Sequence, residues 1–117
     1  MIPVGSGTKV YLAIGATDLR KAIRTLSALV AGKYALDPFS GHLFAFCNRD
    51  CNLIKMLLWD RNGFWLLQKR LEKQRFKWPS SADAVAELSQ RELRWLLDGL
   101  DLAEVQGHRQ LEYNTVY

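Results

Sequence analysis

Residues 53–71, LIKMLLWDRNGFWLLQKRL, hold two apolar runs on either side of a polar turn. The runs at 53–59 and 64–71 have the length and the branched and aromatic side chains typical of β-strands. Between them, the Asn62-Gly63 pair is the preferred centre of a tight hairpin, because both residues tolerate a positive φ. The stretch therefore predicts an antiparallel hairpin.

Both faces of the first of these strands are apolar. Ile54, Met56 and Leu58 would lie on one face, and Leu57 and Trp59 on the other. An antiparallel sheet with one solvated face alternates apolar and polar residues, so this pattern predicts a sheet that is covered on both faces or curled.

Further strand-like segments lie outside the hairpin. A third meander strand is expected at 42–47 and an N-terminal strand at 9–13. Residues 75–78 alternate cations with aromatics at the period of a half-buried strand, and 84–88 could add another. These segments predict an α+β fold built on an antiparallel β-meander sheet of about four to six strands.

One long helix is expected near the N-terminus. Thr17 has the hydroxyl of an N-cap, and Asp18 suits the positive end of the helix dipole. Apolar residues then recur at helical spacing as far as Val30, and Gly32 supplies a stop.

A second, short helix is expected near the C-terminus. Ser89 and Glu92 match the capping box, in which the two side chains reciprocally bond the amides at a helix start. Gly99 would end this helix. Both helices are expected to pack on the sheet.

A chain of 117 residues is long enough for one hydrophobic core. We expect a single domain at 1–101 and a loosely docked tail at 102–117, where no periodicity appears. The N-terminus lacks the basic start and apolar run of a secretory signal, and no apolar stretch has the length of a membrane span. These features predict a cytoplasmic protein.

The formal net charge of +4 favours polyanionic partners such as nucleic acid or acidic protein surfaces. Two basic clusters provide the candidate nucleic-acid-binding residues, one on the outer arc of the predicted long helix and one after the predicted hairpin. They consist of Arg20, Lys21 and Arg24 in the first, and Lys69, Arg70, Lys73, Arg75 and Lys77 in the second. The alternative is an ordinary solvated surface, because exposed Lys and Arg are routine.

Two aromatic residues interleave with the second cluster. Phe76 and Trp78 would stack on bases if they faced outward with the cations. The period of two offers the other possibility, that the aromatics turn into the core while the cations stand in water.

No metal, cofactor or catalytic site is predicted. Cys47 and Cys51 have Cys-x₃-Cys spacing with no second ligand pair, and His42 alone cannot complete a tetrahedral zinc site. His42 and His108 are far apart in sequence, and the scattered aspartates suit turns and caps. We therefore expect a protein that is not an enzyme.

Several ordered motifs resemble the accessory TnpB (Orf2) proteins of the IS66 family of bacterial insertion sequences. They lie at 15–21, 37–44, 59–65, 69–72 and 75–79. This family is distinct from the RNA-guided nucleases that share the name TnpB. The sequence departs from the family pattern at Ala22 and Gln74, where glycine is frequent, and at Cys51-Asn52, where a more basic or Gly-containing turn is usual.

The resemblance implies a non-catalytic accessory role in transposition, beside a separate and larger transposase that performs the strand transfer. It assigns no catalytic residues to this chain. The two basic clusters favour contact with the DNA of the element ends, and the other expected partners are the transposase and further element-encoded proteins. One alternative is a protein–protein adaptor for the transposase that makes no DNA contact, and a small nuclease is disfavoured because no carboxylates converge in the sequence.

We predict that the purified protein contains no stoichiometric zinc and keeps its melting temperature in chelator. Two thiols and one histidine cannot close a four-ligand site. Elemental analysis with a thermal melt checks this, and one bound metal per chain would contradict it.

Overall fold

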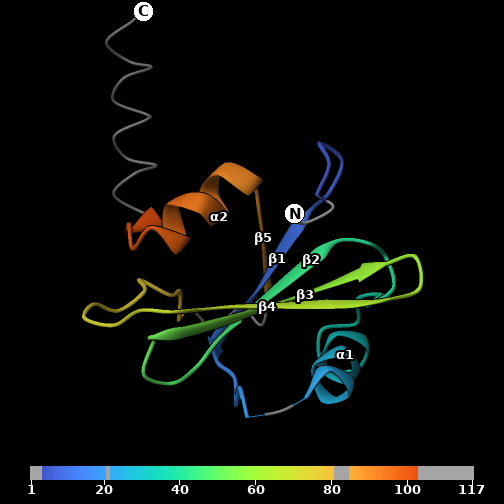
Figure 1. Ribbon diagram of the computed structural model, residues 1–117, viewed down its shortest axis with the longest axis horizontal. Coiled ribbons are helices and arrows are strands. Elements are labelled where there is room, and N and C mark those ends of the chain that lie inside the picture. Colours follow the sequence, from blue (N-terminus) through green and yellow to red (C-terminus); the bar gives the residue numbers. More distant parts are fainter. Residues whose placement is uncertain (1–3, 21, 81–84, 103–117) are drawn as a thin grey trace, which may run out of the picture.

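The computed structural model describes residues 4–20, 22–80 and 85–102, which form five strands and two helices (Figure 1). In chain order the elements are β1 (Val10–Ala16), α1 (Ile23–Ala31), β2 (Leu43–Cys47), β3 (Leu53–Asp60), β4 (Gly63–Arg70), β5 (Val85–Leu88) and α2 (Gln90–Leu97). The α+β character predicted from the sequence is present, with short helices and one open sheet.

The sheet has the order β4-β3-β2-β1-β5 and is mixed. The predicted meander is present as β2, β3 and β4, each antiparallel to the next, and β5 pairs antiparallel with β1. β1 and β2, however, are parallel, so the prediction of an antiparallel sheet was wrong. The reason is that the connection between them contains α1, which returns the chain to the end of the sheet where β1 began, so that β2 runs in the same direction.

The prediction of a long N-terminal helix from Thr17 was also wrong. Helix α1 has nine residues and begins after Ala22, whose side chain makes no cap hydrogen bond. Thr17 instead donates its backbone N–H to the carbonyl of Cys47 at 2.8 Å, which extends the pairing of the two parallel strands. Thr17 therefore continues the strand pairing, and the N-cap position falls at Ala22. Gly32 ends the helix as expected, with its N–H donated to the Ala28 carbonyl.

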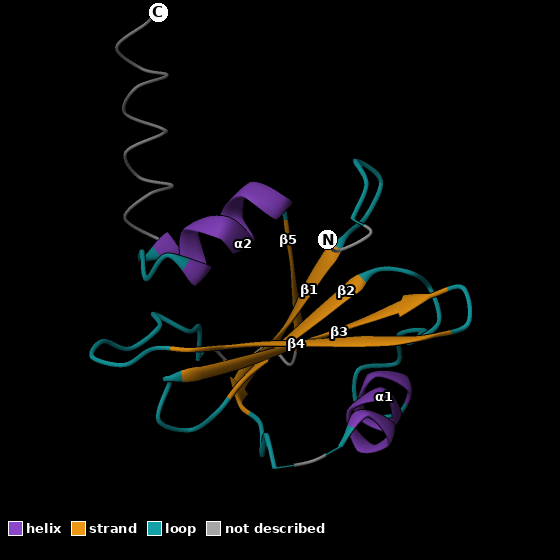
Figure 2. Cartoon of the chain, in the orientation of Figure 1, coloured by secondary structure: helices purple, strands orange, loops and turns teal. Residues whose placement is uncertain are grey.

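The two helices cover opposite faces of the sheet (Figure 2). On one face Leu26 and Val30 of α1 pack with Phe46 and Leu57. Helix α1 thus covers one face of the sheet, and a second apolar layer covers the other face, which confirms the prediction that both faces are covered.

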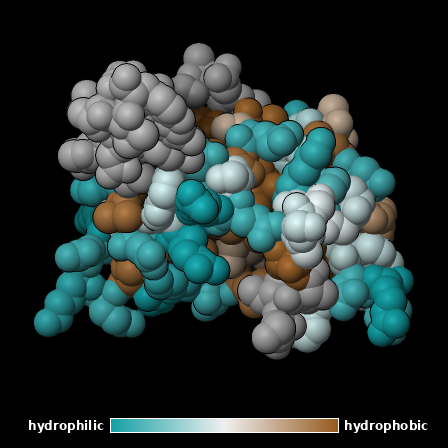
Figure 3. Space-filling model, turned by 90° about the horizontal axis from the view of Figure 1, so that it is seen from above, coloured by the Kyte–Doolittle hydropathy of each residue, from teal (hydrophilic) through white to brown (hydrophobic). Residues whose placement is uncertain are grey.

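That second layer combines α2 with the loop after β4. Leu93 and Leu96 of the helix pack with Ile54 and Met56 of β3, and Phe76 from the loop joins them. Polar side chains cover most of the molecular face seen in Figure 3, with apolar side chains showing between them.

The β3–β4 hairpin is shifted by one residue from the predicted turn. Asp60 pairs with Gly63, so the connecting residues are Arg61 and Asn62. Arg61 takes the positive φ, at +52°. The Asn-Gly preference located the hairpin correctly and its centre incorrectly.

The C-terminal helix follows the sequence pattern closely. The Ser89 hydroxyl accepts from the Glu92 N–H at 3.1 Å, and the Glu92 carboxylate accepts from the Ser89 N–H at 3.0 Å. The predicted capping box is thus confirmed. Of the predicted tail at 102–117, only Leu102 lies within the described residues, where it packs on the apolar layer beneath α2.

Residues 71–80 form a loop and not the strand expected at 75–78. The alternation of the side chains nevertheless survives. Phe76 is 2% exposed, and the indole Nε1 of Trp78 donates to the carbonyl of Ala13 at 2.9 Å, whereas Arg75 and Lys77 are exposed. Both aromatics therefore belong to the interior side of the loop and offer no stacking platform.

No helix in the part of the chain that the structure describes is long and apolar enough to cross a membrane.

Replacing Leu26 by Ala should lower the free energy of unfolding by about 2–5 kcal/mol, because the side chain is fully buried between α1 and the sheet. Thr25→Ala, one residue away and exposed, is the matched control and should change it by no more than about 0.5 kcal/mol. Denaturant unfolding measures both. Equal midpoints for the two variants would contradict the placement of the helix.

Candidate nucleic-acid interface

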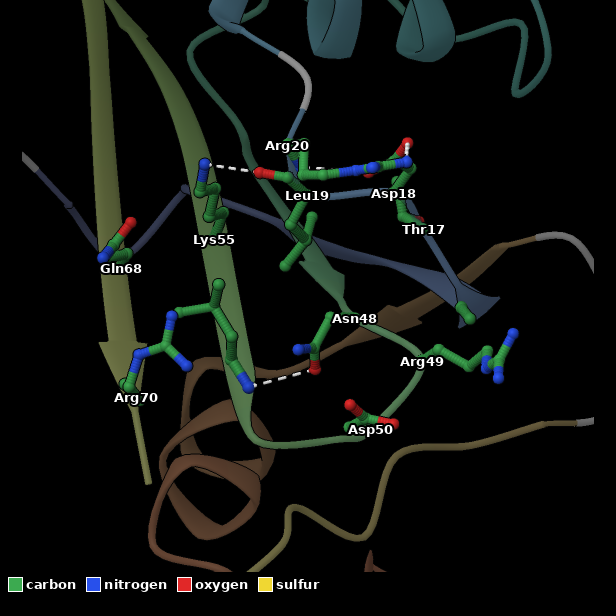
Figure 4. Close-up of a pocket in the computed structure, with 12 residues that line it drawn as sticks. Thr17, Asp18, Leu19, Arg20, Asn48, Arg49, Asp50, Lys55, Gln68 and Arg70 are labelled. Carbon is green, nitrogen blue, oxygen red and sulfur yellow. Dashed lines mark hydrogen bonds and ion pairs between the residues drawn. The ribbon is translucent and has the colours of Figure 1, made fainter. Parts of the chain in front are cut away.

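An open groove of about 770 Å³ lies at the end of the sheet where β1 and β2 both terminate (Figure 4). Three segments form it: residues 16–20 after β1, residues 48–50 between β2 and β3, and side chains of β3 and β4. The parallel pairing places the carboxyl ends of β1 and β2 side by side. The antiparallel strand β3 begins, and β4 finishes, at this same end of the sheet. Segments far apart in sequence meet there for that reason.

The lining of the groove is cationic. Its basic side chains outnumber its carboxylates by four to two, and they come from four different places in the chain. The cations are Arg20, Arg49, Lys55 and Arg70, and the carboxylates are Asp18 and Asp50.

Arg20 and Asp18 form a surface pair at one wall of the groove. The guanidinium donates to both carboxylate oxygens at 3.0 Å, and the Arg20 side chain is 91% exposed. The hydrogen bond to Asp18, and then its charge, raise the pKa of Arg20 above its ordinary value. So exposed a pair contributes little to stability, but it sets the direction of the guanidinium.

Lys55 ties one wall of the groove to the sheet. Its Nζ donates to the backbone carbonyl of Leu19 at 2.6 Å, across 36 positions of sequence. Leu19 is itself buried under α1, so this bond fixes the loop after β1 over the start of β3. The Lys55 ammonium group is thereby held at the groove, while the methylene groups of its side chain are half-buried beside β3.

The turn at 48–52 is built around one asparagine. The Asn48 Oδ1 accepts the backbone N–H groups of Asn52 and Leu53 at 3.0 and 3.1 Å, and its Nδ2 donates to the Asn52 Oδ1 at 2.7 Å. Cys51 takes φ +57°. The result is a rigid turn that presents Arg49 to solvent.

The 71–80 loop is fastened to the same turn. Leu71 donates its N–H to the Asn52 carbonyl at 2.8 Å, and Phe76 donates to the Cys51 carbonyl at 2.7 Å. The exposed side chains of Lys73 and Arg75 therefore stand on a loop that is bonded to the 48–52 turn, next to the turn residues that line the groove. Lys77, also exposed, follows on the same loop.

The structure brings some of the sequence-predicted cations together and separates others. Arg20 and Arg70 line the groove. Arg24 is exposed in the first turn of α1, but Arg20 precedes that helix, so the two do not share a helical arc. Lys69 donates its Nζ to the Leu97 carbonyl at 2.8 Å, where it binds the C-terminal end of α2. Lys21 lies outside the described residues.

Sequence reasoning missed Arg49 and Lys55. Lys55 had a usable signal, since it is the one cation within the apolar run at 53–59. Arg49 had none, because a single arginine in a turn is ordinary and only the fold places it at the groove.

The cysteines sit behind the same turn. Cys47 is fully buried at the end of β2, and burial, followed by the charge of Cys51, raises its pKa to about 12. This thiol therefore stays protonated at neutral pH and is a poor nucleophile or ligand. His42 lies at the opposite end of β2, where its Nδ1 accepts from the Lys9 N–H at 3.0 Å. Within the described ranges, no three His, Cys, Asp or Glu side chains gather as a metal site would require.

These features define a small α+β protein with a basic groove at one end of a mixed sheet. A family model described as IS66 Orf2 like protein matches residues 8–107, and the chain belongs to that family. The proteins of this family are accessory proteins associated with insertion elements, and the family is not a known enzyme class.

Two relatives come from Sinorhizobium fredii (strain NBRC 101917 / NGR234). Uncharacterized protein y4hO is 37% identical over 101 residues, which covers 86% of this chain and 88% of the relative. Uncharacterized protein y4jC is 31% identical over 106 residues and 91% of each chain. No solved structure matches.

Replacing Asn48 by Ala should lower the free energy of unfolding by about 1–3 kcal/mol, because it leaves the backbone donors of the turn without their acceptor. Asn62→Ala, in the exposed turn of the β3–β4 hairpin, is the matched control and should have an effect within about 0.5 kcal/mol. Urea unfolding of both variants checks this. The prediction fails if the Asn48 variant unfolds at the same denaturant concentration as the control.

Proposed function

We propose that this protein is a non-catalytic accessory factor for transposition of its insertion element, and that it binds DNA through the groove and the adjoining 71–80 loop. Membership of the IS66 Orf2-like family supports the connection with transposition. The cationic lining of the groove supports DNA contact. The transposase supplies the chemistry in this proposal, and the protein acts in the cytoplasm, where the DNA of a bacterial element lies.

The observation that carries the proposal is that cations from separate segments converge at one end of the sheet, where β1 and β2 terminate. Arg49 and Arg70 come from the turn after β2 and the end of β4, and Arg20, paired with Asp18, comes from the loop after β1. Arginine presents a planar fork of donors that matches phosphate oxygens in pairs. A chain with formal net charge +4 adds a favourable long-range field.

The expected contacts are with phosphates and not with base edges. The major groove of DNA admits a helix or a two-stranded ribbon, whereas the cations here lie on loops and strand ends around a concave surface. Phe76 and Trp78 are turned inward, so the interleaved aromatics do not stack on bases. Phosphate contacts position a protein on DNA without reading its sequence.

The double variant Arg49→Gln/Arg75→Gln should weaken binding to all duplexes alike and lower the slope of log affinity against log salt by about 1.8, since each lost phosphate contact removes about 0.9. Both side chains are exposed, one at the groove and one on the adjoining loop. Titration of one duplex at several salt concentrations measures the slope, and a thermal melt verifies folding.

The control is Lys33→Gln/Arg91→Gln, which removes the same charge from exposed positions on other parts of the surface. It should leave the slope near that of the wild type. If the two double variants give superimposable curves, the groove makes no phosphate contact, and the adaptor that binds the transposase without DNA becomes the better account.

A further inference from the structure

β4 forms one edge of the sheet, with β3 as its neighbour. Within the described part of the chain, the outer side of β4 has no strand beside it along its eight residues. Proteins protect such edges with short strands or with charged side chains. β5, at the opposite edge, has four residues, whereas the charges of β4 are confined to Lys69 and Arg70 at its end.

The first half of this edge is aromatic and already ordered. Trp65 is 47% exposed, yet its Nε1 donates to the Asp60 Oδ2 at 3.1 Å, which fixes the ring. Phe64 packs against Phe39 and Trp59 with ring centroids 5.5 and 5.0 Å apart. Rings that are held before binding lose little conformational entropy when a partner covers them.

We propose that β4 is the interface between two copies of this chain, paired antiparallel about a two-fold axis through Leu67. The two five-stranded sheets then form one continuous sheet. The occupant follows from the charge pattern of the strand, in which the cations lie at one end and the aromatics at the other.

Antiparallel pairing is the arrangement that this pattern favours. A parallel pair in register would set Lys69 and Arg70 against the same cations of the second copy, and like charges directly opposite are destabilising. In the antiparallel pair centred on Leu67, Trp65 faces the partner's Lys69. Phe64 faces the partner's Arg70. Each aromatic then lies opposite a cation, which is a favourable neighbour for a ring, and no two like charges face each other.

The position of the axis follows from the faces of the sheet. A two-fold axis normal to the sheet keeps the α1 side of both copies together, so opposing residues must both be even-numbered or both odd-numbered. A centre at Leu67 pairs residues 64–70 with 70–64, all within β4. A centre at Leu66 also pairs seven residues of the strand, 63–69, but it sets Lys69 against Gly63 and Arg70 against the turn residue Asn62. Only the centre at Leu67 places both cations opposite aromatic side chains.

The full chain should sediment with twice its 13.4 kDa mass at high micromolar concentration. Trp65→Lys sets a lysine opposite the partner's Lys69 and should give monomers. Leu100→Lys removes a large apolar side chain that is 43% exposed but lies after α2, away from β4, and it should remain dimeric. Monomeric wild type, a dimeric Trp65 variant, or loss of the dimer in both variants would overturn pairing along this edge.

Cross-linking tests the register without weakening the interface first. In a Cys51→Ser background, Leu67→Cys should form an intermolecular disulfide on mild oxidation, because the axis brings residue 67 of each copy face to face. Leu66→Cys, equal in size and one residue away, should not. A covalent dimer from the Leu66 variant, or none from the Leu67 variant, would overturn the proposal.

Discussion

The parallel pairing of β1 with β2 is the constraint on which the groove depends. The Thr17 N–H donates to the Cys47 carbonyl at the last point of contact between the strands, so both leave the sheet together. The loop that carries Arg20 and the turn that carries Arg49 therefore begin side by side. Had the strands been antiparallel, these two segments would lie at opposite ends of the sheet.

Two side chains then convert this proximity into a fixed geometry. Lys55 bonds the Leu19 carbonyl and holds the first loop down on β3. Asn48 saturates the amides of the turn and keeps it in one conformation. Both bonds limit the positions that the groove cations can take, which would lower the entropy cost of the proposed phosphate contacts.

Local patterns predicted the parts of the fold that depend on nearby residues. The meander, the two apolar faces of β3 and the Ser89–Glu92 capping box all follow from neighbours within a few positions. The start of α1 did not, because Thr17 continues the pairing of β1 with β2 through a hydrogen bond to Cys47, 30 positions away, and the N-cap falls at Ala22. The groove was equally inaccessible. Its cations are spread from Arg20 to Arg70, and only the topology brings them together.

The strand order also determines how the molecule can assemble. The meander of β2, β3 and β4 needs only short turns and can form early, whereas β1 must wait for its parallel neighbour across a connection that includes α1. β5 follows the other four strands in the chain and closes the far side of β1. All the residues that line the groove lie between Ala16 and Arg70, ahead of β5 and α2. On the ribosome, the segments that line the groove therefore emerge before the final strand and helix that seal the opposite face.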